Sequence, residues 1–417
     1  MSPRPDPSPG PSAGPAPWID LDAPPAAPHA AAKARLAAAV SVARDEILTL
    51  SREIHADPEP AFEEHRAARR VAAAVARHGY AVEHPAGRLP TAVRATLVGG
   101  LGPDGPAIGI LAEYDALPGL GHGCGHNTMA ASGVGAAIAL AALAPEVRGR
   151  IVFLGTPAEE RGSGKQWMLD DGLFDGLDAA LLFHPGDRTQ VGCVLLASED
   201  VDVTFTGLAA HAAGEPWMGR NALDALILLF DSVGLWRQQL QPDARVHGII
   251  LEGGSAANII PDHAVARFMI RSLHQAHFSA MRERFAQLVQ AAALATGTQG
   301  EAVFSGRSDT MKDNATLADR FRANLAAYGL ADEPVDLDHI GSSDMGNVSQ
   351  VLPTIHPTIA ICKAGVPGHS TAFRDAAGSP EAEAVTLLSA TVVAQTAYEL
   401  LAEPGLAAAA WREFRAG

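Results

Sequence analysis

Cysteine is scarce in this 417-residue chain, and aromatic residues make up only 5% of it. The three cysteines, Cys124, Cys193 and Cys362, are too few and too scattered for a disulfide framework, so we expect a reducing compartment and a cytoplasmic protein. Basic residues are also few, since 31 Lys and Arg stand against 47 Asp and Glu and the net charge is -16. Because nucleic-acid binders need a basic face, this balance argues against a nucleic-acid partner.

Long uninterrupted hydrophobic runs are missing as well. Ala-rich stretches such as "AASGVGAAIALAALA" are broken by glycine, so we expect buried helices and no membrane span. Residues 1–30 are rich in proline, alanine and serine and lack the apolar segment of a secretory signal. That composition predicts a disordered tail.

The order of the expected elements indicates the fold class. Strand-like and helix-like segments alternate through residues 31–198 and again through 310–417, which is typical of an α/β domain with a mostly parallel sheet between helices. Residues 199–309 instead have the pattern β-α-β-β-α-β of a compact α+β unit. We therefore predict a two-domain protein, in which a discontinuous catalytic domain carries residues 199–309 as an inserted lid.

Residue types that bind metals gather in loops framed by glycine and proline. All of them except His369 lie at the expected carboxyl ends of strands or in the loops that follow, which is where ligands bind in open α/β sheets. The set is Cys124 and His126 in "GHGCGHN", Asp115 in "EYDALPG", Glu159 and Glu160 in "GTPAEERGSG", His184 in "FHPG" and His369 in "GVPGHSTAF". Thiolate, imidazole and carboxylate together are the ligands of zinc or another divalent transition metal.

The two adjacent glutamates could have different roles. One carboxylate could bind metal while its neighbour takes a proton from a water activated by that metal. Asp115 would then orient an imidazole ligand. A Cys124 nucleophile paired with His126 or His184 is an alternative, but it would leave the remaining metal-type residues without a role.

The motifs, taken in their order along the chain, resemble those of a known protein family. The ordered series "AEYDALPGLGHGCGHN", "GTPAEERGSGK", "FHPG", "AAHAAGEPWMGRNALDA", "NIIPDHA" and "GHS" resembles the M20 metallopeptidase family. Together with "GSSDMGNVSQVLPTIHP", it is most similar to the M20D amidohydrolases, namely aminobenzoyl-glutamate hydrolase-like and M20 domain-containing dipeptidase-like proteins. The likeness spans roughly residues 45–400.

The resemblance implies a site with two divalent metal ions, zinc or manganese and sometimes cobalt or nickel. It implies Glu159 as the general base, and as ligands Cys124, His126, Glu160, His184 and His369. Two positions depart from the common pattern. Asn127 stands where many members have Asp, and Glu113 stands in the first position of an Asp-x-Asp pair, so whether Glu113 belongs to the site stays open at this point.

The inserted domain and a late loop supply further candidates. The resemblance implies that His211 stabilises the oxyanion, often across a dimer interface, so we expect a homodimer formed through the lid; an ordinary turn histidine is the alternative. Asn258 and Arg271 could hold the carboxylate of the substrate, because an Arg fork matches a carboxylate. Ser343 and Asp344 form a loop that could face the site and contact the substrate.

These observations favour a metal-dependent amidohydrolase with a small-molecule substrate. The expected substrate is an N-acyl amino acid, an aminobenzoyl-glutamate-like compound or a small dipeptide, cleaved by metal-activated water with a glutamate as general base. A catalytically inactive M20-like binding or scaffold protein is the alternative. The intact Glu159 and all five ligand-type residues argue against it.

Overall fold

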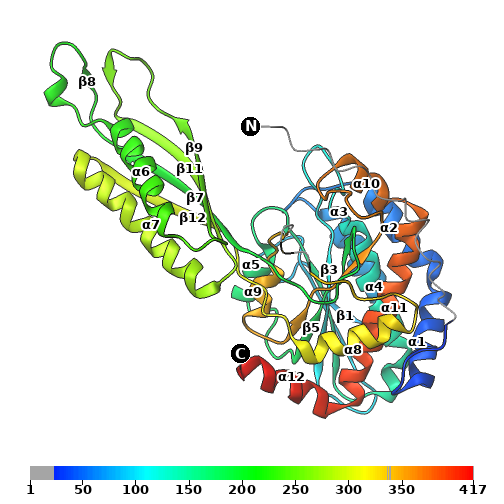
Figure 1. The fold of residues 1–417 in the computed structure, drawn as a ribbon. Coiled ribbons are helices and arrows are strands. Elements are labelled where there is room, and N and C mark those ends of the chain that lie inside the picture. Colours follow the sequence, from blue (N-terminus) through cyan, green and yellow to red (C-terminus); the bar gives the residue numbers. More distant parts are fainter. Residues whose placement is uncertain (1–22, 336, 338–339, 417) are drawn as a thin grey trace, which may run out of the picture.

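The computed structural model describes residues 23–335, 337 and 340–416. Figure 1 shows a rounded part from which a longer, narrower part projects to one side. Each part has its own cluster of buried side chains, and the second cluster contains only residues between Ala197 and Ala293. We call residues 23–196 and 309–416 the larger unit, and residues 197–308 the smaller unit.

A six-stranded sheet forms the centre of the larger unit, with the order β1-β2-β4-β3-β5-β13. Its strands are β1 (Ala81–Glu83), β2 (Val93–Val98), β3 (Ala107–Glu113), β4 (Arg150–Thr156), β5 (Ala179–Leu181) and β13 (Thr354–Ile355). Strand β3 pairs in parallel with β4 and β5, and β13 is parallel to β5. All seven residues of β3 are buried, as expected of a central parallel strand, and only the last of them, Glu113, is charged.

Helices cover this sheet. They are α1 (Ala30–Val42), α2 (Arg44–Ala56), α3 (His65–Arg77), α4 (His126–Leu143), α5 (Gly164–Asp170), α8 (Ala315–Ala326), α9 (Met345–Ser349), α10 (Thr371–Ala377), α11 (Pro380–Ala402) and α12 (Pro404–Ala416), with a 3-10 turn at Ala144–Glu146. Helix α4 packs between β3 and the outer helices α2 and α11. Gly133 allows this approach, because a Cβ there would meet the Ala112 Cβ at 2.8 Å.

The smaller unit is a four-stranded antiparallel sheet with the order β12-β7-β11-β9, and helices lie on one of its faces (Figure 1). Its elements are β7 (Ala197–Thr206), β8 (Ala210–His211), a 3-10 turn (Pro216–Met218), α6 (Ala222–Trp236), a 3-10 turn (Arg237–Gln239), β9 (Arg245–Glu252), β10 (Ile259–Ile260), β11 (His263–Ser272), α7 (Gln275–Thr296) and β12 (Gln299–Ser308). Buried and less buried residues alternate along β7 and β11, because only one sheet face meets the helices.

The predicted α/β class with a largely parallel sheet is confirmed. The long elements of the smaller unit follow the order β7-α6-β9-β11-α7-β12, which is the order that the sequence predicts. The domain boundaries and the role of this unit as a lid stay predictions.

The expected N-terminal tail is only partly described. Residues 1–22 lie outside the described residues, whereas residues 23–29 are placed. Ala23 packs against the core, and His29 Nε2 lies 2.9 Å from Glu403 Oε1. These contacts correct the expectation of a tail that continues to residue 30.

Two helical stretches of the described chain are long and apolar enough to cross a membrane, by length and composition alone. They are His126–Glu146 and Pro380–Ala402, and 83% and 89% of their apolar windows are buried inside the protein. The core helices of a folded domain pass the same test, so this finding is weak evidence for a membrane span.

The buried carboxyl group of Asp313 should make the stability of the protein depend on pH. Asp313 lies just before α8 and forms a bridge with Thr354 of β13. Its Oδ2 accepts a hydrogen bond from Cys193 N, and its Oδ1 is buried with no partner among the described residues. Burial raises the pKa of Asp313 from 3.8 to about 7. Because the folded state keeps a proton that the unfolded state has lost, this carboxyl lowers the free energy of unfolding as pH rises from about 4 to 7.

We expect the free energy of unfolding of Asp313→Asn to exceed that of the unchanged protein by a margin that grows with pH. The margin should grow by on the order of 2 kcal/mol from pH 5 to pH 8, because the amide never ionises. Urea unfolding at both pH values measures the difference. Asp104→Asn, at an exposed position, is the control. An advantage of Asp313→Asn that stays constant with pH would contradict the assignment.

Candidate functional site

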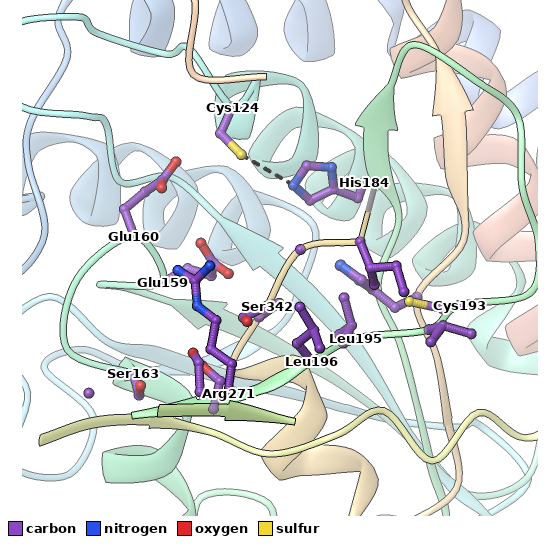
Figure 2. Close-up of a pocket in the computed structure, with 18 of the residues that line it drawn as sticks. Cys124, Glu159, Glu160, Ser163, His184, Cys193, Leu195, Leu196, Arg271 and Ser342 are labelled. Atoms are coloured by element: carbon purple, nitrogen blue, oxygen red, sulfur yellow. Dashed lines mark hydrogen bonds between the residues drawn. The ribbon is translucent and has the colours of Figure 1, made fainter. Parts of the chain in front are cut away.

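The candidate site lies at the carboxyl ends of β3, β4 and β5, where the sequence places the metal-type residues. The segment after β3 carries Asp115 and Cys124, the turn after β4 carries Glu159, and the short strand β6 (His184–Gly186) follows β5. Strand β6 pairs in parallel with β14 (Thr358–Ala360). Figure 2 shows Cys124, Glu159, Glu160 and His184 in one cleft.

The glycine-rich loop before α4 has its sequence for a steric reason. Gly125 has a φ of 79° and directly precedes α4, and a Cβ there would meet Pro185 Cγ at 2.6 Å. Only glycine adopts this conformation in so little space. The loop thereby sends Cys124 and His126 toward β6. His122 points elsewhere, since its Nε2 lies 3.0 Å from Ile54 O.

Asp115 fixes the orientation of the His126 ring. His126 Nδ1 lies 2.9 Å from the backbone oxygen of Asp115 and 3.1 Å from its Oδ1. With Nδ1 held there, Nε2 points toward Glu113 and Glu160, among the other candidate ligands. The predicted role of Asp115 as an orienting residue therefore has the geometry that it needs.

A strained turn presents the two glutamates. Ala158, just before Glu159, has a φ of 59°, and Ser163, after Glu160, has a φ of 55°. Both values are unfavourable for residues with a side chain. Two buried carboxylates hold the turn: Glu64 Oε1 accepts from Ala158 N at 2.8 Å, and Asp115 Oδ2 accepts from Glu160 N at 2.9 Å.

His369 reaches the site from the loop before α10. Its backbone, with a φ of 57°, is tied to the glycine-rich loop because its N donates to Gly123 O at 2.9 Å. His369 Nε2 lies 3.3 Å from Glu160 Oε2. Segments far apart in the chain thus meet at one point.

All five predicted ligands come together in two groups that share one residue. Cys124, His126 and His184 form one group, and Cys124, Glu160 and His369 form the other, each with ligand atoms within 4.8 Å of one another. Within the first group, Cys124 Sγ lies 3.5 Å from His184 Nε2 (Figure 2). The shared thiol lies where it could contact two ions.

Whether these residues fit a metal ion can be judged from the buried polar atoms that lack hydrogen-bond partners. His126 Nε2, Glu160 Oε1 and Glu113 Oε2 are buried and have no hydrogen-bond partner among the described residues. His126 Nε2 lies 3.2 Å from Glu113 Oε2 and 3.9 Å from Glu160 Oε1. Burial, aided by the neighbouring Glu113, raises the pKa of Glu159 well above its usual value. A soft thiol, imidazoles and crowded carboxylates that lack partners fit divalent metal ions.

Beneath this cluster, Lys165 neutralises part of its charge. Its buried Nζ lies 2.5 Å from both Glu113 Oε1 and Asp344 Oδ1. Burial opposes this charge, but the two carboxylates more than offset it and raise the pKa of Lys165 above its usual range. Glu113, whose place in the site the sequence left open, is thus part of it, with one oxygen held by Lys165 and the other facing His126.

Asp344 requires a correction. The sequence predicts a substrate contact, but this carboxylate is fully buried and bound by Lys165, whose backbone N also donates to Asp344 Oδ2 at 2.9 Å. Asp344 is therefore a partner of Lys165 in this structure. Ser343 does line the cleft.

The cleft has a volume of about 560 Å³ and is lined by both units. Arg271 extends into it from β11 of the smaller unit (Figure 2). His211 and Asn258 do not line it. They lie side by side where β8 pairs with β10, at the end of the smaller unit farthest from the larger unit (Figure 1).

Sequence reasoning missed several residues in and beneath the cleft. His356 is 4% exposed, its ring centroid lies 5.4 Å from that of His184, and burial lowers its pKa to about 3. The repeated His-Pro after an apolar strand, in "LLFHP" and "PTIHP", is a signal that could have found it. Glu64, Lys165 and Asp200 carry no comparable motif.

Known proteins resemble this chain in sequence and in fold. The profile of peptidase family M20/M25/M40 matches residues 109–390. The Xaa-Arg dipeptidase of Mus musculus is 36% identical over 408 residues, which cover 92% of each chain. One of the two p-aminobenzoyl-glutamate hydrolase chains of Escherichia coli is 32% identical, over 70% of this chain and 64% of its own.

One solved structure shows the fold. A Bacillus subtilis protein, described as a dinuclear metal-binding peptidase of the M20 family, superimposes with a TM-score of 0.66 at 21% identity, over 87% of this chain and 99% of its own. At that identity the likeness establishes the architecture.

The Glu64 contact predicts a loss of stability. Glu64→Ala would leave the buried N–H of Ala158 without an acceptor, which costs about 1–3 kcal/mol. We expect urea unfolding to detect this loss, whereas Glu63→Ala, at the exposed neighbouring position, should stay within about 0.5 kcal/mol of the unchanged protein. Equal unfolding midpoints for the two variants would mean that Glu64 does not hold the turn.

Proposed function

The chain belongs to the peptidase family M20/M25/M40 and is a hydrolase of amide bonds, and we propose that it cleaves an N-acyl amino acid, an aminobenzoyl-glutamate-like amide or a small dipeptide with the help of two metal ions. The observation that carries the proposal is the thiol of Cys124, shared by two groups of candidate ligands beside buried atoms without partners. The names of the mouse and bacterial relatives support the substrate classes.

The ligands would be the five residues named from the sequence. Cys124, His126 and His184 would hold one ion, and Cys124, Glu160 and His369 the other. Zinc or manganese suits this donor set, and cobalt or nickel is also compatible with it. When bound, such ions supply Lewis-acid activation of the amide carbonyl and of the water that attacks it.

Glu159 would move the proton. Its Oε2 lies 4.0 Å from His126 Nε2, beside the candidate ligands but on the cleft side. As general base it accepts a proton from water while the oxygen attacks the amide carbon, and it then gives this proton to the amine nitrogen as the C–N bond breaks. Glu64 and Asp115 keep the turn fixed during this transfer.

Arg271 and Ser343 would bind substrate in the cleft. The Arg271 guanidinium can grip the carboxylate of the amino-acid half in two-point fashion. Because it belongs to the smaller unit, closing that unit over the larger one would bring it to the substrate and exclude water.

His211 and Asn258 would act in a second copy of the chain. They lie at the far end of the smaller unit, away from their own cleft (Figure 1). Exposed apolar side chains on α6 and on the edge strand β9 support a homodimer through this unit: Ile227, Leu228, Leu235, Ile249, Ile250 and Leu251. An unpaired edge strand beside exposed apolar residues is a surface that a second chain covers.

The metal and base assignments predict opposite results for two variants. Glu159→Gln should keep about two equivalents of metal and lose activity by about 10²–10⁴-fold, because the ligands stay and the base is removed. Cys124→Ser should lose metal, since it alters both ligand groups.

Elemental analysis and a panel of N-acyl amino acids and dipeptides, assayed with zinc or manganese, measure both outcomes. An active Glu159→Gln would show that the base is another residue. If the unchanged metal-loaded protein cleaves no compound in the panel, the result favours the alternative of a catalytically inactive binding protein.

The dimer assignment predicts complementation. Glu159→Gln and His211→Ala chains should each be inactive as homodimers, since an oxyanion donor contributes about 3–4 kcal/mol. Co-expression should restore about a quarter of the activity, because half of the random dimers contain one intact site of two. An Ile249→Asp, Leu251→Asp double variant should abolish this restoration. Full activity of His211→Ala alone would exclude the role in the partner site.

A further inference from the structure

One carboxylate in the cleft has no part in the chemistry described above. Among the described residues that line the cleft, the acidic side chains are Glu159, Glu160 and Asp200. The first two belong to the groups of candidate ligands and to the proton transfer. Asp200 comes from β7 of the smaller unit, across the cleft from them.

The sheet register points Asp200 toward the cleft. On β7, Glu199 and Val201 are buried beneath the helices, so Asp200 lies on the opposite face. Its direct partner on β11 is Met269, and Arg271 lies on the same face one pair further along. Met269 and Arg271 both line the cleft. Asp200 and Arg271 are therefore diagonal neighbours, about 7–8 Å apart between backbones.

The Asp200 carboxylate has no bound cation. In the described part of the chain it takes part in no hydrogen bond or ion pair, whereas Arg267 binds Asp202 through two bonds of 2.6 and 2.9 Å. Burial raises the pKa of Asp200 above its usual value, because the nearby arginines Arg267, Arg271 and Arg161, none of which is paired with it, do not offset the lost hydration. A partly buried carboxylate without a partner gains free energy when a ligand brings the cation.

We propose that Asp200 is a specificity-determining residue, which selects substrates whose released amino acid has a cationic side chain, such as arginine or lysine. This inference rests on the proposed function. Arg271 would take the α-carboxylate, and Asp200 would take the guanidinium or ammonium at the end of the side chain. The backbones of these two residues lie about 7–8 Å apart, which is comparable to the length of an arginine or lysine side chain.

The test compares Asp200→Asn with Asp202→Asn. Both positions lie on the same face of β7, but Asp202 is paired with Arg267 and does not line the cleft. The substrates are matched amides that differ only in the released residue: arginine or lysine, against methionine or glutamine. The readout is kcat/KM, with KM and kcat separated.

For Asp200→Asn we expect kcat/KM to fall about 10–100-fold for arginine and lysine substrates, mainly through KM, and to stay within about twofold for the neutral ones. Asp202→Asn should leave all four unchanged. An equal loss on all substrates would overturn the proposal, because Asp200 would then only position Arg271. No loss on any substrate would also overturn it.

A binding measurement separates this proposal from the function on which it rests. Free arginine and free methionine are titrated by calorimetry into the metal-loaded protein and into metal-loaded Asp200→Asn. Tighter binding of arginine that disappears in Asp200→Asn supports the proposal even if no amide is cleaved. Equal binding of arginine to both proteins contradicts it even if amides are cleaved.

Discussion

The structure depends on a concentration of electron-donating groups at the carboxyl edge of one sheet. Carboxylates of Glu113, Asp115 and Glu160 surround His126, and one buried cation, Lys165, compensates Glu113 from below. Buried charges are stable only when they are paired, so the oxygens and the ring nitrogen that face the cleft need a further positive partner. Divalent ions would satisfy that need, and burial and the same crowding raise the pKa of Glu159. Stability and proposed chemistry thus have one electrostatic origin.

Backbone contacts make this arrangement rigid. Carboxylates of Glu64 and Asp115 hold N–H groups on the two sides of Glu159, and the backbone N of His369 is tied to the glycine-rich loop. The left-handed residues Ala158, Ser163 and His369 are unfavourable alone, and they persist because surrounding hydrogen bonds fix them. Preorganised side chains lose little freedom when a substrate binds, which is the property that a hydrolytic site requires.

The smaller unit offers two surfaces at its two ends. Near the larger unit, Arg271 and Asp200 line the cleft and give it one positive and one negative group for a substrate. At the far end, His211 lies exposed beside Asn258. A single antiparallel sheet separates these ends, so one chain cannot use both at the same cleft. The proposed dimer resolves this separation, because each copy would supply its far end to the other.

The sequence by itself indicated the fold class and the gathering of metal-type residues, because these depend on local periodicity and on short motifs. The choice of Glu159 as base and of five residues as ligands came from the resemblance of those motifs to the M20 family. The sequence also indicated Asp115, since a carboxylate directly after a strand lies near the loop that it orients. Tertiary structure alone decided that Asp344 pairs with Lys165, 179 residues away, and that Glu64 holds a turn 94 residues away. It also decided which face of β7 carries Asp200 into the cleft. Contacts between distant segments leave no periodic signal in the chain, so only the packed molecule reveals which side chains meet.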